Sequence, residues 1–597
     1  MILIRRLYVY LILGVSLFVF AFGLTNLLEL AISQAWTAIG DSRSVSRTSE
    51  EVREAMSLSL ALLAVSIPVW LTHWYLAERW SHTDRPDSDR ASGVRSLFFA
   101  AVLLITAINI LTQLVPVLEA GLATLLGGTA WMTAGDVIFS VSLLSVLLMI
   151  WVFHFVVRMR DERSVEMTGS GIWPVRFSLY AAAFIGAAMM LTGTVNLLRL
   201  AIDAAAGVAQ FTPGSDWWAT NVASGVSLVL VGGLVWGFHW FRSLQLLERK
   251  DWRGAHEQRS ALRRAYLYLV VLGSVIATLA GLSLGVTEVL KASFGVTTVV
   301  ADPWWSRIAS PLVIAIPFGL FWAIHQRIIS LEAERFESGP RKLAVDRMYG
   351  YVVSLIALAF TAGGLAYLLG VFIEYAFERA RILETDPQWI PERISLVLSF
   401  ILIGGSVWVW HWYRIQRRVE ANPELERTAT SRRVYVYVIM TATTLATLIA
   451  LSIILYQGLQ ILLGVRSTEG VASEVGDLIG IVLVAGMLLA YHISILVGDL
   501  RHEEPAVVTA DEGGAIPIPR ASMTLTLAGP ETGDFRATVA EIRRHLPDGF
   551  ELLGAEPEPA IERAGREPAP FEETSEDDHE DGLDEPDAGE AEGRIFT

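Results

Sequence analysis

Long apolar segments separated by short polar loops make up about the first 500 residues. Each holds roughly 20 residues or more, enough for a helix rising about 1.5 Å per residue to cross about 30 Å of hydrocarbon. No Asp, Glu, Lys or Arg falls in the middle of a segment, where a charge costs about 2.5 to 3.5 kcal/mol. The pattern predicts twelve membrane-spanning helices, at residues 7–35, 56–77, 95–115, 134–157, 175–205, 219–241, 263–290, 304–327, 345–376, 393–413, 432–463 and 475–497.

One histidine lies near the end of every second segment, at separations of 81, 85, 86, 86 and 81 residues. Five follow a tryptophan by three positions, and Leu489 replaces that tryptophan in the sixth copy. A small residue precedes some of them by seven positions, as in Gly232, Gly404 and Ala485, on the same helix face. The motif residues are Trp70 and His73, Trp151 and His154, Trp236 and His239, Trp322 and His325, Trp408 and His411, and His492.

A second motif, Arg-x-Tyr-x-Tyr, opens the other helix of each unit. Its clear copies are Arg6, Tyr8 and Tyr10; Arg264, Tyr266 and Tyr268; Arg347, Tyr349 and Tyr351; and Arg433, Tyr435 and Tyr437. Two weaker copies carry Leu97 and Ser178 at the first tyrosine position. Two motifs in the same phase predict an all-α membrane fold of six repeated two-helix hairpins.

Orientation follows from the basic residues. Counting those in or beside the loops, 28 Lys and Arg lie on the side that holds both termini and 10 on the other. Because cytoplasmic loops carry the excess of positive charge, both termini are predicted to be cytoplasmic. The apolar run after Arg6 is too long for a signal peptide and is interpreted as a retained first span.

The net charge of -16 belongs to the C-terminal part of the chain. Residues 501–597 contain 25 acidic and 8 basic residues, a net charge of -17, which leaves +1 for the rest. Such acidity argues against nucleic-acid binding there. The chain has no cysteine, which excludes disulfides, thiol catalysis and cysteine metal sites.

Composition changes after residue 500. Alternating residues near 523–527, a helical spacing at 534–546 and a second apolar run near 550 predict a small cytoplasmic βαβ segment at 501–555. From 556 to 597 Pro, Glu, Asp and Gly dominate, which predicts a disordered acidic tail.

With its Arg-x-Tyr-x-Tyr and Trp-x-x-His motifs, the chain resembles an uncharacterised bacterial family of four-helix transmembrane domains, a domain of unknown function. Two hairpins would make one domain, which implies about three tandem copies at residues 1–165, 166–335 and 336–500. The resemblance implies a helical fold in a bacterial inner membrane and implies no activity.

The six histidines support two interpretations. As packing residues they belong to an interfacial aromatic belt, and sixfold recurrence favours this because a catalytic centre is usually needed only once. As haem ligands, two of them would have to face each other across a gap. A zinc site is less favoured because no acidic partner recurs beside the histidines. No cofactor or metal is therefore expected.

Polar residues near the opposite ends of the spans could line a vestibule for a cation or small solute if they converged. They include Asn26, Glu29, Asn196, Arg199, Glu288 and Glu374.

Motifs of soluble enzymes, such as a phosphate-binding Gly-rich loop or a Gly-x-Ser-x-Gly elbow, are absent from the sequence. The sequence therefore predicts a non-enzymatic multi-pass membrane protein whose cytoplasmic tail binds a protein partner or regulates the protein. The alternatives are a small-solute or ion transporter and a haem-binding redox protein.

Overall fold

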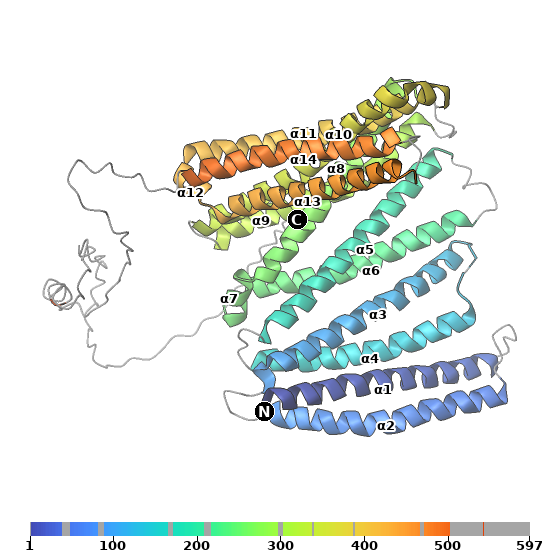
Figure 1. The fold of residues 1–597 in the computed structure, drawn as a ribbon. Helices are drawn as coiled ribbons and strands as arrows, with labels where there is room; N and C mark the ends of the chain where they lie inside the picture. The colour runs from blue at the N-terminus through green and yellow to red at the C-terminus, as the bar shows by residue number, and fades with distance from the viewer. Residues whose placement is uncertain are drawn as a thin grey trace, which may run out of the picture. The chain divides into compact units, whose positions relative to one another are not determined.

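A computed structural model describes residues 2–38, 48–81, 89–129, 131–164, 171–207, 216–296, 303–336, 340–385, 388–465 and 471–501, together with Glu541. Throughout these residues the regular structure is helical (Figure 1). The helices are α1 (Ile2–Ala38), α2 (Ser49–Ser81), a 3-10 turn η1 (Asp89–Ala91), α3 (Gly93–Leu125), α4 (Ala134–Ser164), α5 (Trp173–Ala205), α6 (Trp217–Leu247), α7 (Trp252–Gln258), α8 (Ala261–Ser293), α9 (Trp304–Phe336), α10 (Pro340–Thr385), α11 (Trp389–Ala421), α12 (Pro423–Arg427), α13 (Thr430–Leu462) and α14 (Val471–Arg501).

Twelve of these helices are long and apolar enough to cross a membrane, which confirms the predicted number of spans. Most have 31 to 33 residues, so at about 1.5 Å per residue they exceed the roughly 30 Å hydrocarbon layer and carry polar turns beyond it. Two short helices, α7 and α12, were not predicted and lie at the same end of the bundle (Figure 1).

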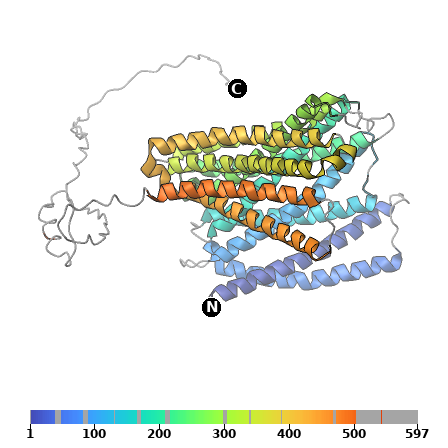
Figure 2. The same ribbon diagram turned by 45° about the horizontal axis from the view of Figure 1, so that its top comes forward.

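Successive spans pack against each other in pairs: α1 with α2, α3 with α4, α5 with α6, α8 with α9, α10 with α11 and α13 with α14. Contacts of α3 with α5 and α6 connect the first four spans to the next four, and contacts between α8 and α11 connect these to the last four. The turned view in Figure 2 shows α1 and α2, in blue, side by side.

In two pairs, α5 with α6 and α10 with α11, the helices approach closely at the small residue seven positions before the histidine. A Cβ added to Gly232 of α6 would lie 2.5 Å from the backbone nitrogen of Met190 in α5. At Gly404 of α11 it would lie 2.9 Å from that of Thr361 in α10. The predicted role of small residues in helix approach is confirmed at these two positions.

Buried side chains form separate aromatic-rich clusters built on the motif residues. One surrounds Tyr10 and Phe99, another Tyr180 and Tyr266, and a third Tyr351. Many outward-facing residues of the spans are large and apolar, as in Phe18 and Leu234, which are 74% and 73% exposed. A surface of this kind fits hydrocarbon as its solvent.

Contacts divide the chain into a compact unit at Met1–Val507 and a second unit at Val508–Thr597. The predicted βαβ segment, apart from Arg501 and Glu541, and the predicted tail lie outside the described residues.

Candidate functional site

The two motifs meet at one end of the spans, because one occurs where a helix begins and the other near the end of an antiparallel neighbour. Aromatic rings, arginines, carboxylates and histidines gather there. We refer to the set formed by the histidines, their aromatic neighbours and the ion pairs described below as the polar layer.

Every motif histidine makes the same local contact: Nδ1 donates to the carbonyl four residues earlier, at 2.7 to 2.9 Å. Because a carbonyl only accepts, Nδ1 carries the proton and Nε2 is left as an acceptor. His154, His325 and His492 are at most 1% exposed, and their Nε2 atoms have no hydrogen-bond partner. His73, His239 and His411 are half-buried.

The three buried histidines have matching aromatic surroundings. Each contacts two rings. One belongs to the tryptophan that directly follows the preceding motif histidine along the chain. The other lies near the start of the span that follows that tryptophan. Ring centroids are 5.9 to 6.2 Å from the imidazole in Trp74 and Phe99 around His154, Trp240 and Tyr266 around His325, and Trp412 and Tyr435 around His492. These histidines therefore occupy positions in aromatic packing.

A carboxylate follows each buried histidine by seven positions and pairs with a buried arginine. Nitrogen to oxygen distances are 2.7 Å for Arg95 and Asp161, 2.5 Å for Arg263 and Glu332, and 2.6 Å for Arg432 and Asp499. These carboxylates lie about two helical turns beyond the histidines, where they pair with arginines, so they do not contradict the expectation that no acidic partner recurs beside the histidines. An acidic residue recurs in alternate units, where it neutralises an arginine.

In two helices the buried pair is made by the residue before the motif arginine. Arg264 is half-buried and Arg433 exposed, whereas Arg263 and Arg432, one position earlier, are buried and paired. Adjacent helical residues point about 100° apart, so only one of each pair can face the core. The acidic residue seven positions after alternate histidines is the signal that could have found them.

A second kind of pair uses the arginine of other motif copies and the unpredicted short helices. Arg347 makes two hydrogen bonds of 2.9 Å to the two oxygens of Glu426 on α12. Arg176 Nη1 lies 2.8 Å from Oε2 of Glu257 on α7. Both carboxylates are buried. The short helices thus bring carboxylates into the polar layer from the loops.

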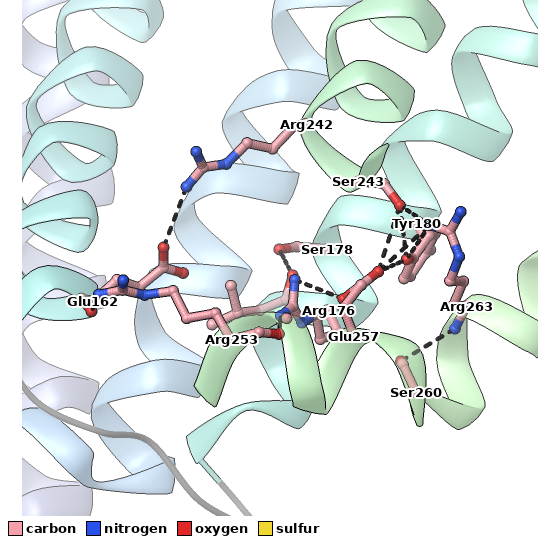
Figure 3. Close-up of polar contacts among 12 residues, drawn as sticks. Glu162, Arg176, Ser178, Tyr180, Arg242, Ser243, Arg253, Glu257, Ser260 and Arg263 are labelled. Carbon is pink, nitrogen blue, oxygen red and sulfur yellow. Dashed lines mark hydrogen bonds and ion pairs between the residues drawn. The ribbon is translucent and has the colours of Figure 1, made fainter. Parts of the chain in front are cut away.

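Glu257 has the most connections in the polar layer (Figure 3). Its Oε1 accepts a short hydrogen bond from Tyr180 and one of 3.4 Å from Ser243, and it lies 3.6 Å from Arg263 Nη1. With Arg176, these partners come from α5, α6 and α8. One fully buried carboxylate therefore connects three spans to a loop helix.

Local features hold Glu257 in place. Asp251 begins α7 by accepting from the backbone N–H groups of Arg253 and Gly254, at 3.1 and 3.4 Å. Burial raises the pKa of Asp251, but hydrogen bonds from Arg249 and from the Gly254 N–H outweigh it and hold that pKa below its ordinary value. A Cβ on Gly254 would clash with the Arg249 carbonyl oxygen, so this turn requires glycine.

The remaining motif residues differ in burial. Tyr10, Tyr266, Tyr351 and Tyr435 are buried, and the motif tryptophans are half-buried. Arg6, Tyr268 and Tyr349 are half-buried, whereas Tyr8 and Tyr437 are exposed. Tyr8 and Tyr349 lie at steep angles to the rings of His73 and His411, with centroids 5.7 and 6.2 Å apart.

The polar residues at the other end of the spans have varied surroundings. Glu374 pairs with Arg393 of α11 at 2.7 Å, and Glu288 with Lys291 of its own helix at 3.0 Å. Asn196 and Arg199 are exposed, and Asn26 and Glu29 are half-buried. In the part of the chain that the structure describes, no three His, Asp, Glu or Cys residues gather as metal ligands would.

Comparison with known sequences agrees with the threefold pattern of the polar layer. The model of a domain of unknown function, DUF5671, matches residues 6–134, 176–343 and 347–487. The chain matches no curated protein and no solved structure. These matches cover most of the sequence in three tandem copies, and the chain belongs to the DUF5671 family.

Proposed function

We propose that this protein is a non-enzymatic integral protein of a bacterial inner membrane, built from six two-helix hairpins. Both termini are cytoplasmic, and the acidic C-terminal segment binds a protein partner or regulates the membrane body. The main observation in support is that buried arginine–carboxylate pairs recur from copy to copy. An ion pair that recurs in every copy supports a structural role, because an enzyme usually needs one catalytic site.

The hydrogen bonding of the polar layer supports the same proposal. A buried charge is tolerated when it is paired, and the arginines of these pairs face carboxylates within 2.9 Å. Such groups hold helices in position. A nucleophile or general base would instead need access to a substrate.

The proposed topology is tested with single cysteines, since the chain has none of its own. We expect Leu425→Cys and Glu248→Cys, at the polar-layer end, to react with a membrane-impermeant maleimide only after spheroplasts are permeabilised. Leu126→Cys and Phe294→Cys should react in intact spheroplasts. Reaction of the first pair from outside contradicts the orientation. All four positions are exposed, so accessibility alone does not decide the result.

The role of the C-terminal segment is tested by deleting residues 508–597. We expect the truncated protein to keep the thermal stability of the full chain and to lose a partner that crosslinks to the full chain in cells. A version with the tail acidic residues changed to Asn and Gln separates charge from length. Identical crosslinking patterns for the full and truncated chains contradict the proposal.

Haem binding is the alternative for which a specific observation exists, namely the unpartnered Nε2 atoms of His154, His325 and His492. The aromatic rings packed around all three favour the structural interpretation. A Soret band in the purified protein that is lost in His325→Phe would favour haem instead, and a spectrum without that band supports packing.

A further inference from the structure

A groove lies between the first and second copies and runs along the spans. Residues from α3, α4, α5 and α6 line it, and Leu104, Trp151 and His239 belong to both its inner and its outer part. The inner part is apolar and reaches Leu111 and Ile185. The outer part ends in the polar layer.

Arginines dominate the outer end of this groove. Arg158, Arg176, Arg242 and Arg253 line it, and Glu162 is the acidic residue among them. Figure 3 shows Glu162 with Arg176, Arg242 and Arg253. Arg158 and Arg176 are 4% and 7% exposed. Even when Glu257 and Asp251, the partners of Arg176 and Arg253, are included, cations exceed anions.

Glu162 is shared between two of these arginines at long distances. It lies 3.5 Å from Arg158 and 3.4 Å from Arg242, whereas the paired arginines elsewhere in the polar layer lie within 2.9 Å of a carboxylate. A guanidinium has five N–H donors, and a carboxylate offers two oxygens. One carboxylate therefore faces two guanidinium groups at this end of the groove, which leaves a surplus of positive charge there, although Arg242 also donates to Met159 Sδ.

A departure from the repeat gives the groove space. In the first and third copies Tyr8 and Tyr349 place a ring near the first histidine. In the second copy Ser178 occupies that motif position, and it lines the groove with His239. A smaller residue at this position leaves room where the other copies carry a tyrosine.

We propose that this groove binds one anionic phospholipid, whose phosphate contacts the arginines and whose acyl chain follows the apolar wall. Basic pockets between spans at the cytoplasmic face bind such headgroups. The apolar continuation distinguishes a lipid from a soluble anion, because a free phosphate leaves that wall uncovered. A groove between α10, α13 and α14 has no charged lining residue and serves as an internal comparison. The inference goes beyond the proposed function and rests on one part of it, the cytoplasmic placement of the polar-layer end; lipid binding in detergent is measured independently of that placement.

The test is native mass spectrometry of the full chain in detergent, titrated with phosphatidylglycerol or phosphatidylcholine. We expect the tightest-binding lipid to be phosphatidylglycerol. Each arginine near a membrane surface contributes about fivefold to such binding, so Arg242→Gln with Arg253→Gln should weaken it by about 25-fold. Arg414→Gln is the matched control, since Arg414 also follows a motif histidine by three positions but lies outside the groove.

Ser178→Tyr tests whether lipid binding needs the space beside His239, and it changes no charge. It restores the residue that the other copies carry, and we expect it to weaken phosphatidylglycerol binding while leaving thermal stability unchanged. Glycerol phosphate should not compete. The proposal would be overturned by equal affinity for the two lipids or by an arginine double variant that binds like Arg414→Gln. Full competition by glycerol phosphate would also overturn it, because it would show a site for a soluble anion.

Discussion

Arg432 donates from Nε and Nη2 to the two carboxylate oxygens of Asp499, at 2.6 and 3.2 Å, across 67 residues of sequence. Its neighbour Arg433 is exposed on the same helix. The pair therefore connects the start of α13 to the end of α14, and its arginine lies one residue before the motif arginine.

Replacing one member of this pair should strongly destabilise the protein, because the other charge stays buried and uncompensated. Arg432→Gln is expected to cost about 3 to 5 kcal/mol, whereas Arg433→Gln should change stability by about 0.5 kcal/mol or less. Unfolding followed in detergent measures both. Equal effects of the two variants would contradict the buried pairing of Arg432 with Asp499.

Arg347 and Glu426 allow a test by exchange. Arg347→Glu and Glu426→Arg should each destabilise the protein by several kcal/mol, since each places two like charges together in a buried site. The double exchange should recover part of the loss, with a coupling of about 0.5 to 3 kcal/mol. Strictly additive losses would mean that the two side chains do not interact.

Gly232 and Gly237 lie on the same helix in different surroundings. A Cβ at Gly232 would lie 2.5 Å from the Met190 nitrogen, whereas one at Gly237 meets no atom within 4 Å. Gly232→Ala should therefore force α5 and α6 apart and cost about 1 to 3 kcal/mol. Gly237→Ala should be neutral or stabilise by up to about 1 kcal/mol. Thermal unfolding of both variants measures the difference, and a neutral Gly232→Ala would contradict the close helix contact.

Asp216 gives a pH-dependent contact outside the spans. It accepts hydrogen bonds from the hydroxyl and from the backbone N–H of Thr129, the latter at 3.1 Å, and these hold its pKa below the ordinary value. The contact should be complete above the unfolded-state pKa of about 3.9 and should be lost as pH falls through the lower folded-state pKa.

Hydrogen exchange at Thr129 measures this change. Protection should fall below about pH 4 in the wild type, and Asp216→Asn should remove the acid transition. An acid transition of the same midpoint in Asp216→Asn would assign it to another group.

The sequence alone determined the number of spans, the family and the threefold repetition, because hydrocarbon imposes a length and a polarity on each span that show in composition. The C-terminal segment and the roles of the motif residues stay predictions. Tertiary structure decided which arginine of Arg263 and Arg264 is buried, that Glu257 and Glu426 enter the polar layer from short loop helices, and that Ser178 leaves a groove beside His239. The physical reason is that a buried charge depends on a partner that is distant in sequence, and only the folded chain brings the two together.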